Sequence, residues 1–463
     1  MDATYLFAKN FRTVAYEDLP PEVVEVTKKE VLDALAVAIA GFSQPGAKEL
    51  LEIVQAWGGR EESSIIGCKQ KVPAPNAAQV NATMVHALDF DDVHEKAVMH
   101  PGVVTIPTAL AVGELKAGLS GKEFVTAVAL GVDMLCRLGL ATRPGVSPIK
   151  TGFHFTTLYG YPTAALTAGR ILGLDEERMV NAFGIAYHQC SGNGQCVIDG
   201  ALTKRMGPGF SVRAGVMTAL LAEKGVTGAR NCLEGEAGLY RVYHHGEYDP
   251  HVLIHDLGKH FEGINVSIKP YPCCRGVHPS IDAALSVANK YDIKPEDVKE
   301  IIISTGEANH YLLCTPFEQK VRPRNPVDAQ FSIPWGVATA LAKKKVTMEH
   351  FTEEAINSHD ILHLTGRIRV EPDLSLNMSP TRQIEPARVK VEMRDSRVYT
   401  ETVEDPAGSP KRPMSFADVA EKFKDCVSHS QKRLSDDHIQ RIVDLVADLE
   451  NLKEAGEIIR LLT

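Results

Sequence analysis

The sequence predicts a mainly α-helical protein with a large all-helical domain and a smaller α+β domain. Apolar residues recur at three-to-four spacing through most of residues 1–264, as they do on the buried face of a helix. Most of the β-branched, alternating segments come later, within residues 265–413. Residues 414–463 return to helical spacing. We therefore predict that residues 1–264 and 414–463 form one discontinuous helical domain and that residues 265–413 form the α+β domain.

The first region begins with two helices and a short hairpin. Two prolines at positions 20 and 21 are tolerated in a first helical turn, and apolar residues at helical spacing follow until Gly41. A second helix is expected after Pro45. The β-branched run from Ser63 to Gly67 indicates a small hairpin strand before Pro73. A third helix, over Asn76–Leu88, leads into the most polar stretch of the chain.

Further helices are expected beyond that stretch. Segments dense in Ala, Gly and Thr allow helices to approach closely, so Tyr159–Gly173 is predicted to be a central helix buried on most sides. Ser191–Gly194 reads as a turn, because it matches no phosphate-binding pattern. The other segments with a helical pattern are Thr108–Lys116, Glu123–Leu138, Gly184–Tyr187 and Val212–Leu221.

The second region mixes strands and helices. Arg388–Met393 and Arg397–Val403 alternate between apolar and polar residues on either side of a short turn, which is typical of a hairpin. Ile301–Ser304 and Arg367–Val370 are further strands. The expected helices are Ser280–Lys290, Trp335–Ala342 and Met348–Ile356.

The C-terminal tail is predicted to pack on the N-terminal helices. A Pro/Gly-rich linker, residues 405–413, precedes it, and Ser415 with Asp418 can cap its first helix. An apolar stripe needs a partner there; its members are Ile439, Ile442, Val446 and Leu449.

Composition argues against several classes of function. The 463-residue chain has a formal net charge of −9 and no run of Lys and Arg, which disfavours nucleic acid or an anionic membrane as the main partner. The nearest approach to a membrane span, Ala34–Ala40, is too short. No secretory signal is visible, and nine cysteines at irregular spacing indicate reduced thiols. We expect a cytoplasmic protein.

One stretch, Val85–Pro107, concentrates groups that carry protons or bind metals. Carboxylates and imidazoles are the usual ligands of a hard or borderline metal, and they are equally the usual groups of acid–base catalysis. A plain helix cap with surface acids is a third interpretation. The cluster consists of His86, Asp89, Asp91, Asp92, His94 and His100.

Four other stretches are candidates for function. His154 stands just before the buried Tyr159–Gly173 helix. Lys204 and Arg205 lie at a glycine-flanked bend before a helix, where backbone N–H groups also favour an anion. The third stretch, at the domain boundary, contains Lys269, Arg275 and His278, and the fourth, Asp328–Trp335, opens a helix.

In this order, these motifs resemble the MmgE/PrpD family, which contains 2-methylcitrate dehydratases, cis-aconitate decarboxylases and iminodisuccinate epimerases. The resemblance extends from about Tyr5 to the C-terminal helices. Its most specific parts are Ala87-Leu-Asp-Phe-Asp-Asp, His100-Pro-Gly, Gly152-Phe-His, Thr203-Lys-Arg, Lys269-Pro-Tyr-Pro and His278-Pro.

The resemblance implies a helical domain, a smaller α+β lid domain, a homodimer, and an active site between the two domains that needs no metal or organic cofactor. By resemblance, Asp89, His100, His154 and Lys204 are the catalytic residues. Those implied to bind substrate are Asp92, His94, Arg205, Lys269, Arg275, His278 and Trp335. Val93 replaces a Thr of the decarboxylase branch, and Trp335 stands where its pocket has a Tyr, so the substrate stays open.

We therefore expect a cofactor-independent lyase that removes a proton α to a carboxylate of a small di- or tricarboxylate. A 2-methylcitrate dehydratase-like or cis-aconitate decarboxylase-like reaction is the primary expectation, and an epimerase of the iminodisuccinate type is the alternative. A metal-dependent hydrolase that uses His86, Asp89, Asp92 and His94 is a further hypothesis.

Overall fold

The computed structural model describes residues 2–142, 151–379 and 384–463. The described chain divides into two compact units. Residues 1–268 and 415–463 form the first, and residues 269–414 form the second. The mainly α-helical fold class expected from the sequence is confirmed, with a four-stranded and a two-stranded sheet in the described residues.

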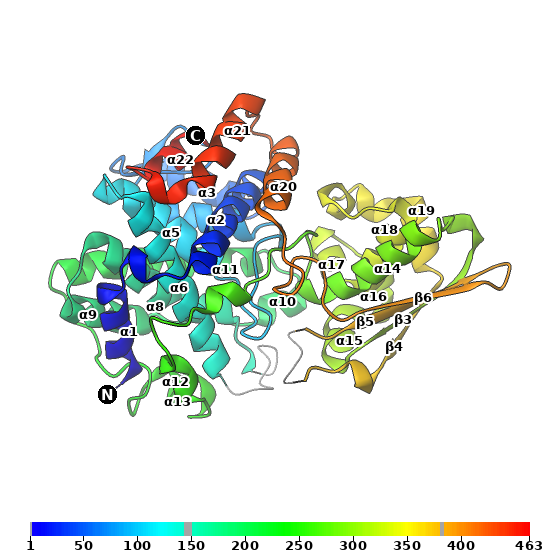
Figure 1. Cartoon of the computed structure of the whole chain (residues 1–463), viewed down its shortest axis with the longest axis horizontal. Helices are drawn as coiled ribbons and strands as arrows, with labels where there is room; N and C mark the ends of the chain where they lie inside the picture. The colour runs from blue at the N-terminus through cyan, green and yellow to red at the C-terminus, as the bar shows by residue number, and fades with distance from the viewer. Residues whose placement is uncertain (1, 143–150, 380–383) are drawn as a thin grey trace. The chain divides into compact units, whose positions relative to one another are not determined.

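The first unit is a packed array of helices (Figure 1). Its longer helices are α1 (Ala3–Thr13), α2 (Pro21–Gly41), α3 (Ala47–Trp57), α4 (Ala74–His86), α5 (Gly102–Lys116), α6 (Gly121–Ala141), α8 (Phe155–Leu172), α9 (Glu176–Tyr187), α11 (Thr203–Glu223), α20 (Phe416–Ser428) and α21 (Asp436–Ala447). Its shorter helices are α10 (Gln195–Asp199), α12 (Leu239–His244), α13 (Pro250–Ile254) and α22 (Gly456–Arg460), and the expected hairpin consists of β1 (Ser63–Ser64) and β2 (Lys71–Val72).

The core of this unit forms where α8 and α11 pack closely together. Every residue of α8 except Arg170 is buried, as the small-residue pattern predicts. A Cβ built on Gly215 of α11 would lie 2.4 Å from the Cβ of Ala164 in α8, so only glycine allows this approach. The close packing fixes the N-terminal ends of both helices, where His154 and Lys204 lie.

Helix α6 corrects the expectation that no apolar segment is long enough to span a membrane. In the described part of the chain it is the one helix long and apolar enough to do so, and 94% of its most apolar stretch is buried. Its buried Arg137 and Asp133 form an ion pair of 2.8 Å, and Arg137 also donates hydrogen bonds to the carbonyls of Val252, His255 and His260. These contacts are those of a core helix.

The C-terminal helices pack on the N-terminal part of the same unit. Ser415 and Asp418 form the predicted capping box at the start of α20. Helix α20 lies against α2, and α21 also contacts α2 (Figure 1). The predicted apolar stripe is buried, with Leu449 in the short 3₁₀ turn Leu449–Asn451 that follows α21. Residues far apart in the sequence thus share one core.

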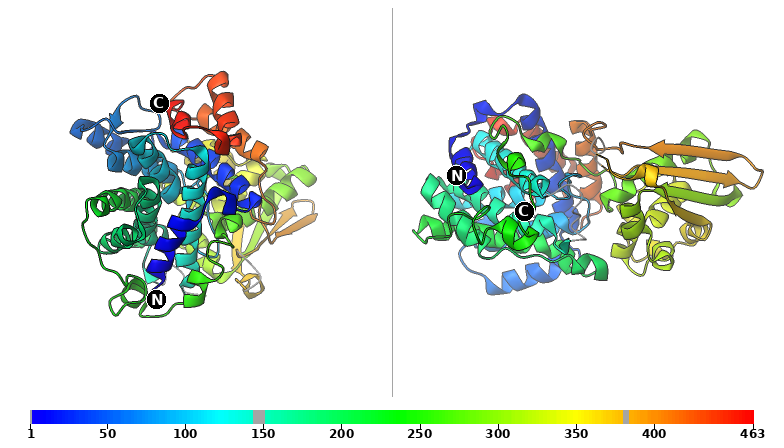
Figure 2. Two further views of the ribbon diagram at one scale, coloured as in Figure 1. Left: turned by 60° about the vertical axis from the view of Figure 1, so that its left-hand side comes forward. Right: turned by 90° about the horizontal axis from the view of Figure 1, so that it is seen from below.

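The second unit has a mixed sheet in the order β4-β3-β5-β6, with its helices on one side (Figure 2). Its strands are β3 (Val298–Thr305), β4 (Ile368–Pro372), β5 (Ala387–Met393) and β6 (Val398–Val403), with β3 and β4 parallel and the other pairs antiparallel. Its helices are α14 (His278–Lys290), α15 (Glu307–Cys314), α16 (Phe317–Val321), α17 (Pro326–Gln330), α18 (Ile333–Lys343) and α19 (His359–Thr365).

Two helix predictions need correction. Met348–Ile356 is not one helix but two 3₁₀ turns, Met348–Phe351 and Ala355–Asn357. The Thr352 hydroxyl accepts the Ala355 N–H at 3.1 Å, and such local side-chain bonds compete with a continuous helix. Helix α5 begins at Gly102, earlier than expected, because it tolerates Pro107 in its interior.

Candidate active site

The polar cluster lies where α4 ends and the chain loops over to α5. Helix α4 ends at His86, and Asp89, Asp91 and Asp92 follow in the loop. Asp89 has a φ of 52°, in the left-handed region that non-glycine residues rarely adopt. Such backbone strain persists only where surrounding contacts hold it, and it concentrates at functional sites.

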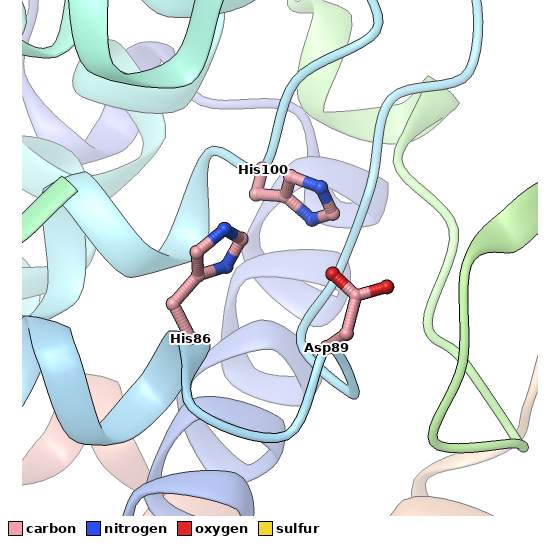
Figure 3. A group of neighbouring side chains, drawn as sticks. All are labelled: His86, Asp89 and His100. Atoms are coloured by element: carbon pink, nitrogen blue, oxygen red, sulfur yellow. The ribbon is translucent and has the colours of Figure 1, made fainter. Parts of the chain in front are cut away.

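His86, Asp91 and His100 form a connected array. The Nδ1 atom of His86 lies 2.7 Å from Oδ2 of Asp91, and Nδ1 of His100 lies 3.5 Å from the same oxygen. The two imidazole rings meet edge to face, with centroids 4.8 Å apart. Figure 3 shows His86 and His100 facing each other, with Asp89 beside them. His86 and Asp91 are buried, whereas the His100 side chain is 14% exposed.

A backbone carbonyl fixes the tautomer of His100. Its Nδ1 lies 2.6 Å from the carbonyl oxygen of Asp92, and a carbonyl can only accept a hydrogen bond. The proton of the neutral ring therefore lies on Nδ1, and Nε2 carries the lone pair. The backbone N–H of His100 donates to the Thr156 hydroxyl at 3.1 Å. The half-buried His100 is thus held as an oriented base.

His154 joins the same group from the start of α8. Its ring centroid lies 5.8 Å from that of His86, and its Nδ1 lies 2.8 Å from the Thr157 hydroxyl. Burial, together with the charges of Lys204 and His86, holds the pKa of His154 well below its usual value. His154 is consequently neutral at neutral pH.

Lys204 supplies the cation of the site. It lies in the first turn of α11, is half-buried, and forms an ion pair with Asp89 through Nζ and Oδ1. The structure therefore brings the four predicted catalytic residues, Asp89, His100, His154 and Lys204, into one group around His86.

Three residues expected to bind substrate have structural contacts in this unit. Asp92 accepts the backbone N–H of Gly102 at 2.9 Å and thereby caps α5. The ring of buried His94 accepts the Ala97 N–H through Nδ1 at 3.1 Å, and its Nε2 lies 3.4 Å from a Glu262 carboxylate oxygen. Arg205 donates to the Pro45 carbonyl at 3.0 Å, and burial lowers its pKa.

The other four candidates lie in the second unit. Buried Arg275 donates to the Ala407 carbonyl at 2.8 Å and contacts Nδ1 of His278 at 3.0 Å, while Nε2 of His278 faces the Cys273 carbonyl at 3.3 Å. Lys269 is fully buried. Trp335 belongs to the apolar core, and its indole N–H donates to the His350 carbonyl at 3.1 Å. We do not retain Trp335 as a substrate-contacting residue.

The cluster also offers a possible metal-binding group. His86, Asp89 and His100 each present one ligand atom within 4.8 Å of the others. This group differs from the hydrolase hypothesis, because Asp92 and His94 have the contacts just described. Lys204 forms an ion pair with Asp89, so its ammonium would repel a divalent metal ion bound to the same carboxylate. The charges therefore suit proton transfer better than metal binding.

Two residues of this array, His86 and Asp91, belong to the polar cluster of the sequence but not to the site residues that the resemblance implies. Asp91 stands in the quoted Asp-Phe-Asp-Asp motif and His86 precedes it by five positions, so the motif itself pointed to them. Their pairing depends on the course of the loop after α4, and spacing alone does not determine that course.

Comparison with known proteins supports the resemblance. Residues 6–251 match the MmgE/PrpD N-terminal domain and residues 271–450 match the MmgE/PrpD C-terminal domain. The chain is 26% identical over 467 residues to a cis-aconitate decarboxylase of Aspergillus terreus, covering 97% of this chain and 93% of that protein. It is 26% identical to the cis-aconitate decarboxylase of Homo sapiens over 471 residues, covering 99% and 94%, and 24% identical to that of Mus musculus over 472 residues, covering 99% and 93%.

Proposed function

The chain belongs to the MmgE/PrpD family, and on this premise we propose that it is a lyase that acts on a small di- or tricarboxylate by proton transfer at the carbon next to a carboxylate. Decarboxylation of cis-aconitate is the first candidate reaction, because relatives with that name align along nearly the whole chain. Dehydration of a 2-methylcitrate-like substrate uses the same type of proton transfer and is the second. The reaction requires no metal or organic cofactor.

One observation carries the proposal. His100 is oriented by the Asp92 carbonyl so that Nε2 is the atom that can accept a substrate proton, and Lys204 lies in the same group of residues. An ammonium has three N–H donors, so Lys204 can bond Asp89 and a substrate carboxylate together. A positioned imidazole beside a fixed cation is what proton transfer to or from a carbon α to a carboxylate requires.

The residues have distinct roles in this mechanism. Lys204 binds a substrate carboxylate and stabilises the enolate-like charge that develops on it. Nε2 of His100 moves the proton, and the Asp91 carboxylate near its ring stabilises the imidazolium form. His154 stays neutral, because burial keeps its pKa low, and it orients the substrate by hydrogen bonding.

The two reactions differ in the bond that breaks. In decarboxylation the His100 ring first takes up a proton from solvent at Nε2. The carbon–carbon bond to one carboxylate then breaks, carbon dioxide leaves, and the electron pair left on carbon takes that proton. In dehydration the neutral ring removes the α proton, the neighbouring carbon–oxygen bond breaks, and the hydroxide takes a proton from solvent and leaves as water. Return of the removed proton on the opposite face would give epimerisation, the alternative outcome.

A substrate panel tests the proposal. Purified protein is incubated with cis-aconitate, 2-methylcitrate, citrate and iminodisuccinate, and the products are identified by mass spectrometry. We expect turnover of one acid with loss of carbon dioxide or water, abolished in His100→Gln and retained in the control His255→Gln, which changes an exposed histidine of the same unit. An epimer of unchanged mass would favour the alternative, and no reaction with any polycarboxylate would contradict the proposal.

A further inference from the structure

The loop that carries Asp89 and Asp91 is held by a lysine from the far end of the sequence. Lys422, in α20, donates from Nζ to the carbonyl oxygen of Phe90 at 2.8 Å. The same ammonium lies 3.7 Å from the centroid of the Phe90 ring. Phe90 stands between Asp89, which pairs with Lys204, and Asp91, which contacts His86 and His100. A single cation therefore fixes the backbone between the two carboxylates.

Lys422 is itself fixed by α2. Its Nζ lies 2.5 Å from Oδ1 of Asp33, and the two side chains are only 4% and 1% exposed. Burying an unpaired charge has a high free-energy cost. The buried ammonium of Lys422 therefore stays close to the groups that it contacts. The ion pair joins α2 and α20 directly beneath the loop.

The loop needs such an anchor. The backbone of Asp89 lies in the left-handed region, where a non-glycine residue is strained. Without a fixed neighbour the peptide could relax and move both carboxylates. The contact of Lys422 with the Phe90 carbonyl opposes this movement.

We infer that Lys422 of the C-terminal helix α20 is a positioning residue, which holds the Asp89–Asp91 loop in the geometry that proton transfer requires. The inference rests on the proposed function for its catalytic consequence. Lys422 contacts the peptide between the two carboxylates rather than the reacting groups. Its loss should lower kcat while KM for the substrate, which Lys204 binds, changes little.

The variants separate positioning from simple stability. Lys422→Met removes the anchor but leaves Asp33 buried without its cation, so Lys422→Met combined with Asp33→Asn removes both charges and protects the fold. Lys422→Arg retains a buried cation with several donors. Lys424→Met is the matched control, because Lys424 lies on the same helix, is 44% exposed and pairs with Glu421.

Two measurements are made on each variant after circular dichroism has shown that it is folded. The first uses ¹⁵N-labelled histidine and records the tautomer of His100 by NMR, with the signal assigned from His100→Gln; this measurement needs no turnover. The second is kcat and KM for the acid that the wild type converts. In Lys422→Met and in the double variant we expect loss of the Nδ1-protonated preference of His100 and a kcat lowered about 10- to 100-fold. Lys422→Arg and Lys424→Met should stay near the wild type.

The outcomes distinguish the two proposals. If the His100 tautomer is unchanged in the double variant, Lys422 only stabilises the fold and the inference is overturned, whatever happens to kcat. The inference is also overturned if the tautomer changes but kcat per folded molecule equals that of Lys424→Met. If the wild type converts no polycarboxylate while the tautomer still depends on Lys422, the proposed function fails and the positioning of the loop stands.

Discussion

Lys204 is the residue at which substrate binding can be weakened directly. Lys204→Met removes the cation expected to hold a substrate carboxylate. Hydrogen bonds to charged groups contribute about 1.5–3 kcal/mol of binding free energy. We therefore expect kcat/KM to fall roughly 10- to 100-fold or more. Lys204→Arg should retain part of the activity. Steady-state kinetics checks this, with Lys224→Met, an exposed lysine at the other end of α11, as the control. Unchanged kinetics in Lys204→Met would remove Lys204 from the site.

Buried His244 predicts how the free energy of unfolding depends on pH. Burial, and then the charge of His245, lowers the pKa of His244 to about 4. The unfolded histidine has a pKa of about 6.5 and takes up its proton first as the pH falls, so the free energy of unfolding decreases between about pH 6.5 and pH 4. From about pH 7.5 to about pH 5 the loss should be about 2 kcal/mol.

Urea unfolding of the wild type and of His244→Gln at these two pH values checks the prediction. The Gln side chain can still accept a hydrogen bond from the Tyr159 hydroxyl, which lies 2.7 Å from Nε2 of His244 in the wild type. The variant should lose about 2 kcal/mol less than the wild type between the two pH values. Equal losses in both proteins would show that His244 does not contribute to this pH dependence.

Residue types at the site were easier to predict than residue contacts. Asp89, His100, His154 and Lys204 were expected at the site because the motifs that resemble the family contain them. The contacts of Asp92, His94 and Arg205 with backbone groups and Glu262 did not follow, since they depend on the path of loops. A capping carboxylate and a substrate-binding carboxylate look alike in a sequence.

At the scale of elements, the start of α5 depends on a glycine. The N–H of Gly102 bonds both carboxylate oxygens of Asp92, and a Cβ at Gly102 would lie 2.9 Å from Oδ2 of Asp92. Gly102→Ala should therefore push the cap away and destabilise the protein by about 1–3 kcal/mol. It should also lower kcat, because the carbonyl of the same Asp92 orients His100.

Thermal unfolding and kinetics of Gly102→Ala check this prediction. Gly194→Ala is the matched control, since its added Cβ would meet nothing closer than 3.5 Å and its φ of −87° suits alanine. If both variants melt at the same temperature as the wild type, α5 does not depend on this cap.

The periodic elements were predictable and the irregular ones were not. Helices such as α8 and strands such as β5 repeat a burial pattern over many residues, and that repetition survives in the sequence. The two 3₁₀ turns after Thr347 depend on local hydrogen bonds of Thr352 and His350 side chains, which compete with a helix without changing the apolar spacing. The membrane-like apolarity of α6 was missed because its charged pair, Asp133 and Arg137, interrupts the run.

At the scale of the whole molecule, an exposed apolar surface predicts self-association. Phe210, Met217 and Leu221 follow one another along the exposed side of α11 at helical spacing. Trp57 of α3 is 60% exposed and lies beside this stripe, with the Arg213 guanidinium 5.6 Å from its ring. Contiguous apolar patches of this kind mark interaction sites. The family resemblance implies a homodimer, and we propose that the second copy of the chain covers this surface.

Light scattering after size-exclusion chromatography tests the proposed homodimer. The wild type should have twice the mass of one chain, and Phe210→Glu combined with Met217→Glu should be monomeric, because burying two carboxylates in an apolar interface is strongly unfavourable. Val398→Glu, a change at an exposed apolar residue of the second unit, should remain dimeric. A monomeric wild type would contradict the proposal.

The most direct test asks whether the His, Asp and Lys cluster transfers protons or binds a metal. Protein is treated with a chelator, exchanged into metal-free deuterated buffer, and assayed by mass spectrometry on the polycarboxylate that untreated protein converts. We predict an unchanged rate, with solvent deuterium on carbon in the decarboxylated product or in substrate recovered from a reversible dehydration. Activity that is lost on chelation and restored by one divalent ion would contradict proton transfer without a metal and would assign His86, Asp89 and His100 to a metal centre.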